Sequence, residues 1–128
     1  MAGATGDRRR GTARRGEALA ALFLRLKGYR MEARNWRCPL GEIDIVARDR
    51  KTLVFVEVKA RTSASAGSPE AAVNPQKQAR LVQLAQVYLT QLHGPTPPCR
   101  FDVIAVEARR WLPRIRHLRA AFRADGLA

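Results

Sequence analysis

The sequence has only two cysteines, two histidines and no long apolar run. Cys38 and Cys99 form no Cys-x-x-Cys pair and have no histidine at metal-ligand spacing. Free thiols are therefore expected, and neither a zinc site nor a disulfide framework is indicated. His93 falls in a Gly/Pro-rich segment and His117 in an arginine-rich one, and we interpret both as surface or packing residues.

The apolar stretches are also too short for a membrane. Residues 18–24 are the best candidate for a signal core, but no small-residue cleavage site follows them and they fit a helix better. No run approaches the roughly 20 residues that a bilayer requires. The sequence therefore predicts a cytoplasmic protein without a membrane partner.

Acidic residues are scarce, because 11 Asp and Glu stand against 24 Lys and Arg in 128 residues, a net charge of +13. A polyanion is the natural partner of such a chain, since binding phosphates releases counterions. An arginine-rich composition without functional meaning is the alternative, and charge alone leaves DNA, RNA and the ribosome open. The length and the 46% apolar content indicate one globular domain.

Periodicity predicts an α/β domain over residues 13–128, preceded by a disordered basic arm over residues 1–12. The expected elements are a helix over 14–27, strands over 29–37, 41–47 and 52–61, a loop over 62–74, a helix from 75 to about 92, and a strand over 99–107. Residues 111–118 suggest an edge strand interrupted at Pro113, and residues 119–124 a short final helix. The order α-β-β-β-α-β implies a layered domain with a mixed sheet.

Charged side chains interrupt the apolar face of the third predicted strand. Leu53, Phe55, Glu57 and Lys59 share one face, because residues alternate along a strand. A solvated face would expose the two apolar residues, and a fully buried face would leave the charged pair without water. A cleft at the end of this strand resolves the conflict.

Asp44 reaches the same face if the second and third strands form a hairpin with an even loop. A tight turn at residues 49–50 places Asp44 diagonal to Glu57, whereas a turn at residues 50–51 places the two directly opposite. Both registers bring the carboxylates within roughly 4.5 to 8 Å of each other at Cβ. An odd loop would send Asp44 to the other face.

Two carboxylates at this separation repel each other unless positive charge lies between them. Lys59 supplies part of that charge, and a hard divalent ion such as Mg²⁺ or Mn²⁺ would supply more. Such an ion polarises a phosphodiester and lowers the pKa of bound water, while Lys59 could orient that water or stabilise charge on the phosphate. A surface salt-bridge cluster is the alternative interpretation.

Three segments carry a family resemblance: GEIDIV at 41–46, LVFVEVKAR at 53–61 and RFDVI at 100–104. With Gly16-Glu17 and Gly28-Tyr29, they resemble the YraN-type family of bacterial proteins, which is similar to archaeal Holliday junction resolvases and is regarded as a family of endonucleases. The acid–acid–lysine set itself resembles the PD-(D/E)xK nuclease signature. The resemblance covers about residues 16–106 and implies a restriction-endonuclease-like three-layer core.

The resemblance also implies roles for individual residues. By position, Asp44 and Glu57 would be metal ligands, with the Val58 backbone carbonyl as a further ligand. Lys59 would be the catalytic lysine. Glu17 matches the acidic residue that joins the site from the first helix in such resolvases.

The sequence departs from the pattern at two positions. Ile43 stands where a proline names the motif. Ala60 replaces the threonine often found after the lysine, which leaves the immediate surroundings of that lysine unspecified.

Candidate nucleic-acid contacts lie outside the motif. Lys77 occupies the sheet-facing side of the second helix, where a phosphate contact and a lysine that extends into solvent fit the pattern equally. Arg61 and Arg80 are candidate contacts to backbone phosphates, which fix position without reading sequence. Trp36 and Trp111 could stack on bases, although packing is the expected role of both.

The sequence thus predicts an Mg²⁺- or Mn²⁺-dependent endonuclease that hydrolyses DNA, with branched or flapped DNA as the substrate. The alternative is a non-catalytic nucleic-acid-binding module of the same fold, and a third interpretation is an assembly factor that acts on another protein. A homodimer is expected by analogy with two-fold symmetric resolvases. Cleavage that disappears on mutation of Glu57, while DNA binding persists, would distinguish the enzyme from the binding module.

Overall fold

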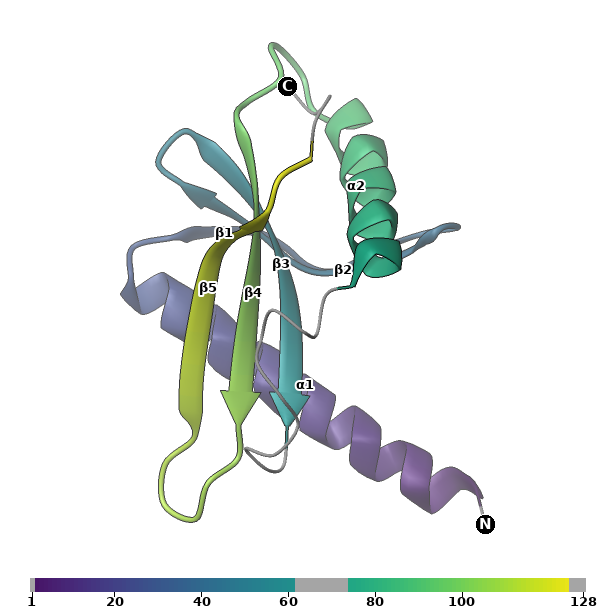
Figure 1. Ribbon diagram of the computed structural model, residues 1–128, viewed down its shortest axis with the longest axis vertical. Helices are drawn as coiled ribbons and strands as arrows, with labels where there is room; N and C mark the ends of the chain where they lie inside the picture. Colours follow the sequence, from purple (N-terminus) through teal and green to yellow (C-terminus); the bar gives the residue numbers. More distant parts are fainter. Residues whose placement is uncertain (1, 62–73, 125–128) are drawn as a thin grey trace.

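The computed structural model describes residues 2–61 and 74–124, with side chains from residue 14 onward. Within these residues, two helices and five strands follow one another along the chain (Figure 1). They are α1 (Ala2–Leu26), β1 (Arg30–Cys38), β2 (Gly41–Asp49), β3 (Thr52–Arg61), α2 (Pro75–Thr90), β4 (Cys99–Glu107) and β5 (Arg114–Phe122). The predicted α/β class is confirmed, with one strand added to the predicted order.

The described strands form a five-stranded sheet in the order β1-β2-β3-β4-β5. β3 and β4 run parallel, and the other neighbouring pairs run antiparallel, so the sheet is mixed as predicted. A parallel pair needs a long crossover connection, and α2 lies within it. The apolar run at residues 53–56 is buried, as expected for a central strand covered on both faces.

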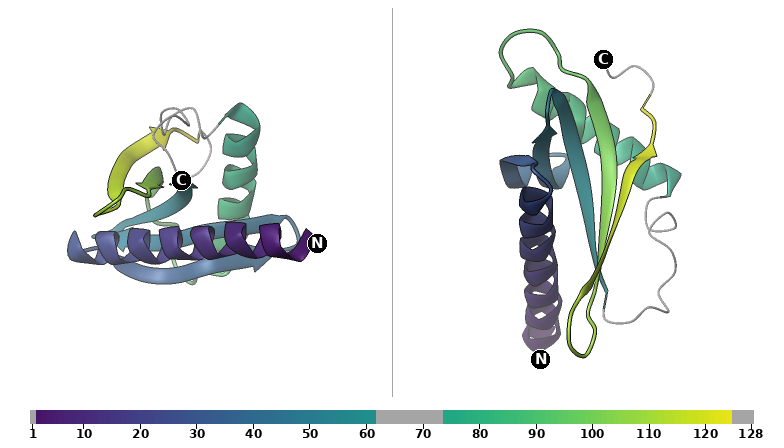
Figure 2. Two further views of the ribbon diagram at one scale, coloured as in Figure 1. Left: turned by 90° about the horizontal axis from the view of Figure 1, so that it is seen from below. Right: turned by 90° about the vertical axis from the view of Figure 1, so that its left-hand side faces the viewer.

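The two helices cover opposite faces of the sheet (Figure 2). Leu24 of α1 packs in one apolar cluster with Val54 of β3, and Leu84 of α2 packs in the other with Phe55. Burying one such side chain contributes roughly 1.5–3 kcal/mol. Because residues alternate along β3, its even positions face α1 and its odd positions face α2.

The second helix begins as predicted. The Asn74 side chain accepts a hydrogen bond from the backbone N of Lys77 at 2.9 Å, and Pro75 occupies the first turn. The helix ends at Thr90, two residues before the predicted end. The loop predicted over 62–74 lies, up to residue 73, outside the described residues.

The first helix is longer than predicted. It begins at Ala2, where the sequence predicts a disordered arm up to residue 12. Alanine and arginine are frequent in this stretch and both have high helix propensity. The helix ends before Gly28, which has a φ of +94° and serves as the predicted stop. Neither described helix is long and apolar enough to cross a membrane.

The C-terminal segment is a strand, and the short helix predicted over residues 119–124 is wrong. β5 pairs antiparallel with β4, and Phe122 stacks on Phe101 with ring centroids 4.7 Å apart. Pairing and packing on β4 thus override the local helix propensity. Pro113 falls just before the strand begins, so the predicted edge strand forms without a proline inside its ladder.

Candidate active site

The β2–β3 hairpin has a two-residue turn at residues 50–51, which confirms the second of the two predicted registers. The ladder stops one pair short of Asp44, and one further step places Asp44 across from Glu57. There Asp44 Oδ2 accepts a hydrogen bond from the backbone N of Val58 at 2.8 Å. The Asp44 carboxylate thus takes the place of a backbone acceptor at the end of the β2–β3 ladder.

The strand beside Asp44 contains a residue with a left-handed backbone conformation. β1 pairs with β2 on both sides of Asn35, but Asn35 itself has a φ of +52°, a conformation enriched in asparagine. Ile45 packs on the α1 side of the sheet and Ile43 on the α2 side, although residues two apart in a regular strand share a face. The strand therefore turns over at Asp44, where groups from both faces can approach its carboxylate.

Three carboxylates converge at this point. Within the described residues, one oxygen from each of Glu17, Glu42 and Asp44 lies within 4.8 Å of the other two. Glu17 comes from α1, and the other two come from β2. Gly16 permits the close approach of α1, because a Cβ at Gly16 would lie 2.7 Å from the Cβ of Ala60. A larger residue at this position would move Glu17 away from the cluster.

The pKa values of two acids in the cluster are raised. Burial, followed by repulsion from Glu57, raises the pKa of Asp44 to about 7 despite the hydrogen bond from Val58. Burial also raises the pKa of Glu17, against a hydrogen bond from the Asn35 side chain. An environment that raises the pKa of its acids disfavours their charged forms, so a cation placed among them would be strongly attracted.

Two lysines approach the carboxylates from the α2 side. Lys59 Nζ lies 3.5 Å from Glu57 Oε1. A hydrogen bond with Lys59, and repulsion from it, lower the pKa of Lys77 in the first turn of α2. Lys77 and Arg80 line a cavity of about 250 Å³ together with Glu42 and Glu57. Positive side chains therefore stand at the rim of the carboxylate cluster.

The structure brings most of the predicted site residues together. The group comprises Glu17, Asp44, Glu57, Val58, Lys59, Lys77 and Arg80. Arg61 lies apart from them, in a separate pocket that Arg15 and Leu19 also line. Its predicted phosphate contact would therefore not belong to the same cavity.

The sequence predicts no role for Glu42 or Asn35. Glu42 precedes Asp44 by two residues, but the strand turns over at Asp44, so regular alternation along a strand does not by itself place Glu42 in the cluster. Glu42 also forms an ion pair with Arg37 at 2.9 Å. Asparagine tolerates a positive φ without requiring it, so nothing in the sequence identifies Asn35 as a residue with this backbone conformation.

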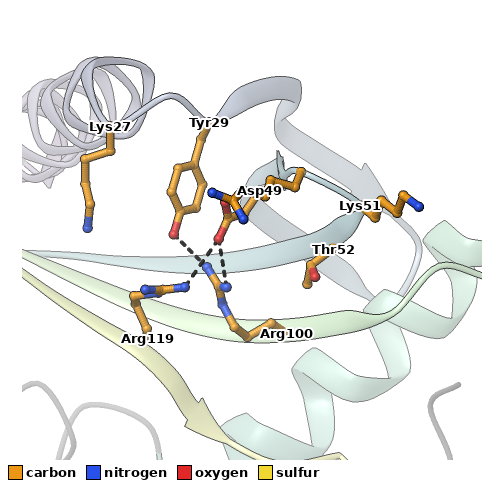
Figure 3. Close-up of a pocket in the computed structure, with 8 residues that line it drawn as sticks. Lys27, Tyr29, Asp49, Lys51, Thr52, Arg100 and Arg119 are labelled. Carbon is orange, nitrogen blue, oxygen red and sulfur yellow. Dashed lines mark hydrogen bonds and ion pairs between the residues drawn. The ribbon is translucent and has the colours of Figure 1, made fainter.

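A second polar network lies at the opposite end of β3, beside the β2–β3 turn (Figure 3). Arg100 is its centre and donates to Asp102 at 2.9 Å, to Asp49 at 3.0 Å and to the Tyr29 hydroxyl at 2.7 Å. His117 Nε2 lies 2.7 Å from Asp102 Oδ2. These contacts connect β2, β4 and β5 with Tyr29, which directly precedes β1, so the network holds the strands together.

Arg100→Met is expected to lower the free energy of unfolding by about 1.5–3 kcal/mol, because it removes a charged hydrogen-bond donor from the buried Asp102, which keeps His117 and the backbone N of Ala120 as partners. Although burial raises the pKa of Asp102, hydrogen bonds from His117 and Arg100 hold it below its usual value, so the contribution is present at pH 7. Urea unfolding measures the difference. Arg119→Met is the matched control, since Arg119 also pairs with Asp49 but is 58% exposed, and should cost less than about 1 kcal/mol. Equal effects would contradict the role assigned to Arg100.

The fold and the site together define a class of protein. It is an α/β domain with a restriction-endonuclease-like core, in which acids from the first helix and the second strand meet a lysine on the central strand. The chain belongs to the family described as "Uncharacterised protein family UPF0102", whose model matches residues 16–106. This membership confirms the resemblance to the YraN-type family.

Individual relatives cover most of the chain. A UPF0102 protein of Anaeromyxobacter dehalogenans is 46% identical over 125 residues, which span 98% of this chain and 93% of that protein. A UPF0102 protein of Chlorobium phaeobacteroides is 53% identical over 95 residues, or 74% and 75% of the two chains. One from Nocardia farcinica is 46% identical over 108 residues, or 84% and 85%. These names state a family and no activity, so a reaction must be argued from the site.

Proposed function

We propose that the protein is a metal-dependent endonuclease that hydrolyses DNA phosphodiester bonds. The observation that carries the proposal is the meeting of Glu17, Glu42 and Asp44 beside the Glu57–Lys59 ion pair at the end of the central strand. Such a concentration of acids is unfavourable for folding on its own. A net charge of +13 favours a polyanionic substrate.

The donor set suits Mg²⁺ or Mn²⁺. Its atoms are carboxylate oxygens, the hard ligands that these ions prefer. Burial and repulsion from Glu57 raise the pKa of Asp44, so a cation beside its carboxylate would favour the charged form. Asp44, Glu42 and Glu17 would hold the ion, with Glu57 and the Val58 carbonyl as further ligands. The Val58 N–H points to Asp44, and the carbonyl of a strand residue lies on the same side as its N–H. When bound, such an ion polarises a phosphodiester and lowers the pKa of water.

The lysines would face the phosphate. An anion beside Lys59 and Lys77 would relieve the repulsion that helps to lower the pKa of Lys77. Glu57 pairs with Lys59 and so sets the position of its ammonium group. That ammonium would stabilise the negative charge that develops on the phosphate during hydrolysis. Arg80, on the same cavity, would contact a neighbouring phosphate.

A panel of substrates and ions tests the proposal. Four-way, flapped, single-stranded and intact duplex DNA are incubated with the protein and Mg²⁺, Mn²⁺, Ca²⁺ or EDTA. We expect cleavage of branched or flapped DNA with Mg²⁺ or Mn²⁺ and none with EDTA. DNA binding without cleavage under any ion would favour the non-catalytic binding module instead. Light scattering on the same complexes tests for the homodimer that coordinated cutting of two strands would need.

A further inference from the structure

The hairpin that joins β4 to β5 carries two exposed apolar side chains at its tip. Trp111 is 85% exposed and Leu112 is 78% exposed. Trp36, the other tryptophan of the chain, packs edge-on against Tyr88 with ring centroids 5.4 Å apart. The expectation that both tryptophans have packing roles therefore holds for Trp36 and is wrong for Trp111.

Positive charge surrounds this tip. Arg109, Arg110 and Arg114 are exposed, and the Arg110 guanidinium lies 5.7 Å from the centre of the Trp111 ring. Glu107, the last residue of β4, is buried and pairs with Arg109 at 3.7 Å and with Arg116 at 3.5 Å. Burying these arginines against an apolar protein surface would be costly. An aromatic ring among cations instead matches a ligand with flat faces flanked by negative charges.

The hairpin extends the end of the sheet that carries the candidate active site. Lys59 of β3 lies beside Ala105 of β4 in the parallel ladder. Two residues further along β3, the Arg61 carbonyl accepts a hydrogen bond from the backbone N of Ala108 at 2.8 Å, which anchors the base of the hairpin. Figure 1 shows the hairpin loop beyond the ends of β3 and β4. DNA that reaches the lysine can therefore also meet the tip.

We propose that Trp111 stacks on an unpaired base of DNA, and that Arg110 and Arg114 contact the flanking phosphates. This inference rests on the proposed function in taking DNA as the ligand, and it adds the element that selects the substrate. In an intact duplex, the neighbouring bases cover both faces of each base, so the indole finds no free face. A branch, flap or single-stranded segment offers one, and stacking on an aromatic side chain contributes about 1–3 kcal/mol per base.

The fluorescence of Trp111 reports the contact directly. In a Trp36→Phe protein, Trp111 is the remaining tryptophan, and EDTA separates binding from any metal-dependent reaction. We expect saturating single-stranded, flapped or four-way DNA to quench the emission, and long intact duplex to bind with little quenching. The anisotropy of labelled DNA gives the affinity in the same samples.

Substitutions at the tip separate stacking from apolar contact. Trp111→Leu keeps an apolar side chain without an aromatic face, and should weaken the affinity for flapped DNA by about 5- to 150-fold. Trp111→Phe should retain most of the affinity. Leu112→Ala is the matched control at the neighbouring exposed position and should leave the affinity nearly unchanged. Because the tip is exposed, all three proteins should melt at the wild-type temperature.

Unchanged affinity of the Trp111→Leu protein for flapped DNA, or unquenched emission at saturation, would overturn this inference. A Trp111→Leu substitution that converts a dimer to a monomer and leaves the DNA affinity intact would also overturn it, because the tip would then be a contact between chains. Failure to bind any DNA would overturn both proposals. Quenching by a protein that cuts nothing would support stacking alone, and cleavage without any contribution from Trp111 would support the nuclease alone.

Discussion

Glu57→Gln is expected to reduce metal-dependent cleavage about 100-fold or more while DNA affinity stays nearly unchanged. The substitution preserves the shape of the side chain but removes its charge, and with it the ion pair that positions Lys59. It also makes the surface that DNA approaches more positive, so binding is not weakened. Initial rates with Mg²⁺ and anisotropy in EDTA, on the same flapped DNA, give the two quantities.

Glu32→Gln is the matched control for this substitution. Glu32 lies on β1 outside the carboxylate cluster, where it accepts a hydrogen bond from Tyr88 and pairs with Arg48. Its replacement should leave the cleavage rate of the folded protein unchanged. Wild-type cleavage by the Glu57→Gln protein would place the reaction elsewhere. Equal losses in both variants would indicate a general structural effect.

The central strands are predictable because burial imposes a single pattern on them. The predicted bounds of β3 and β4 match the structure. The sequence does not determine the register between β2 and β3, because turns at residues 49–50 and 50–51 both place Asp44 on the same face as Glu57. Arg50 adopts a φ of +58° in this turn, a conformation that hairpins usually assign to glycine or asparagine. The residue types therefore give no preference for the turn that forms.

The remaining features of the site depend on contacts between distant segments. Glu42 joins the cluster where β2 turns over at Asp44, beside Asn35 with its positive φ. Glu17 reaches it because Gly16 lets α1 lie against Ala60 of β3. Likewise, the C-terminal segment becomes a strand because β4 offers it an edge. Tertiary pairing of this kind overrides local propensity and leaves no mark within one window of sequence.

Asp44→Asn is expected to stabilise the metal-free protein at pH 8. Burial and repulsion from Glu57 raise the pKa of Asp44 from 3.8 to about 7 in the folded state. Between those values the folded protein binds a proton that the unfolded chain has released, so the stability of the wild type falls as the pH rises. Above about pH 7 the loss is complete, and the pKa difference limits it to roughly 4 kcal/mol.

A protein with asparagine at this position does not lose stability in this way as the pH rises. It cannot ionise, and its side-chain oxygen can still accept the hydrogen bond from the backbone N of Val58. In EDTA, the melting temperatures of the two proteins should therefore be closest near pH 4 and should separate as the pH rises to 8. Asp49→Asn, the same change in the same strand, should act in the opposite direction. Hydrogen bonding from Arg100 lowers the pKa of Asp49, so its charged form is favoured in the folded protein.

Mn²⁺ should reverse the order of the two proteins. An ion that binds only the folded wild type at 100 times its dissociation constant adds about 2.7 kcal/mol of stability, whereas the Asp44→Asn protein has lost a charged ligand and should gain little. Thermal melts at pH 8 with increasing Mn²⁺ measure both responses. If the melting temperatures of the two proteins respond equally to pH and to Mn²⁺, then ionisation of Asp44 does not lower the stability and Asp44 does not hold the ion. If the wild type gains stability from Mn²⁺ and the variant does not, the carboxylates that disfavour folding in EDTA are the same ones that attract the cation.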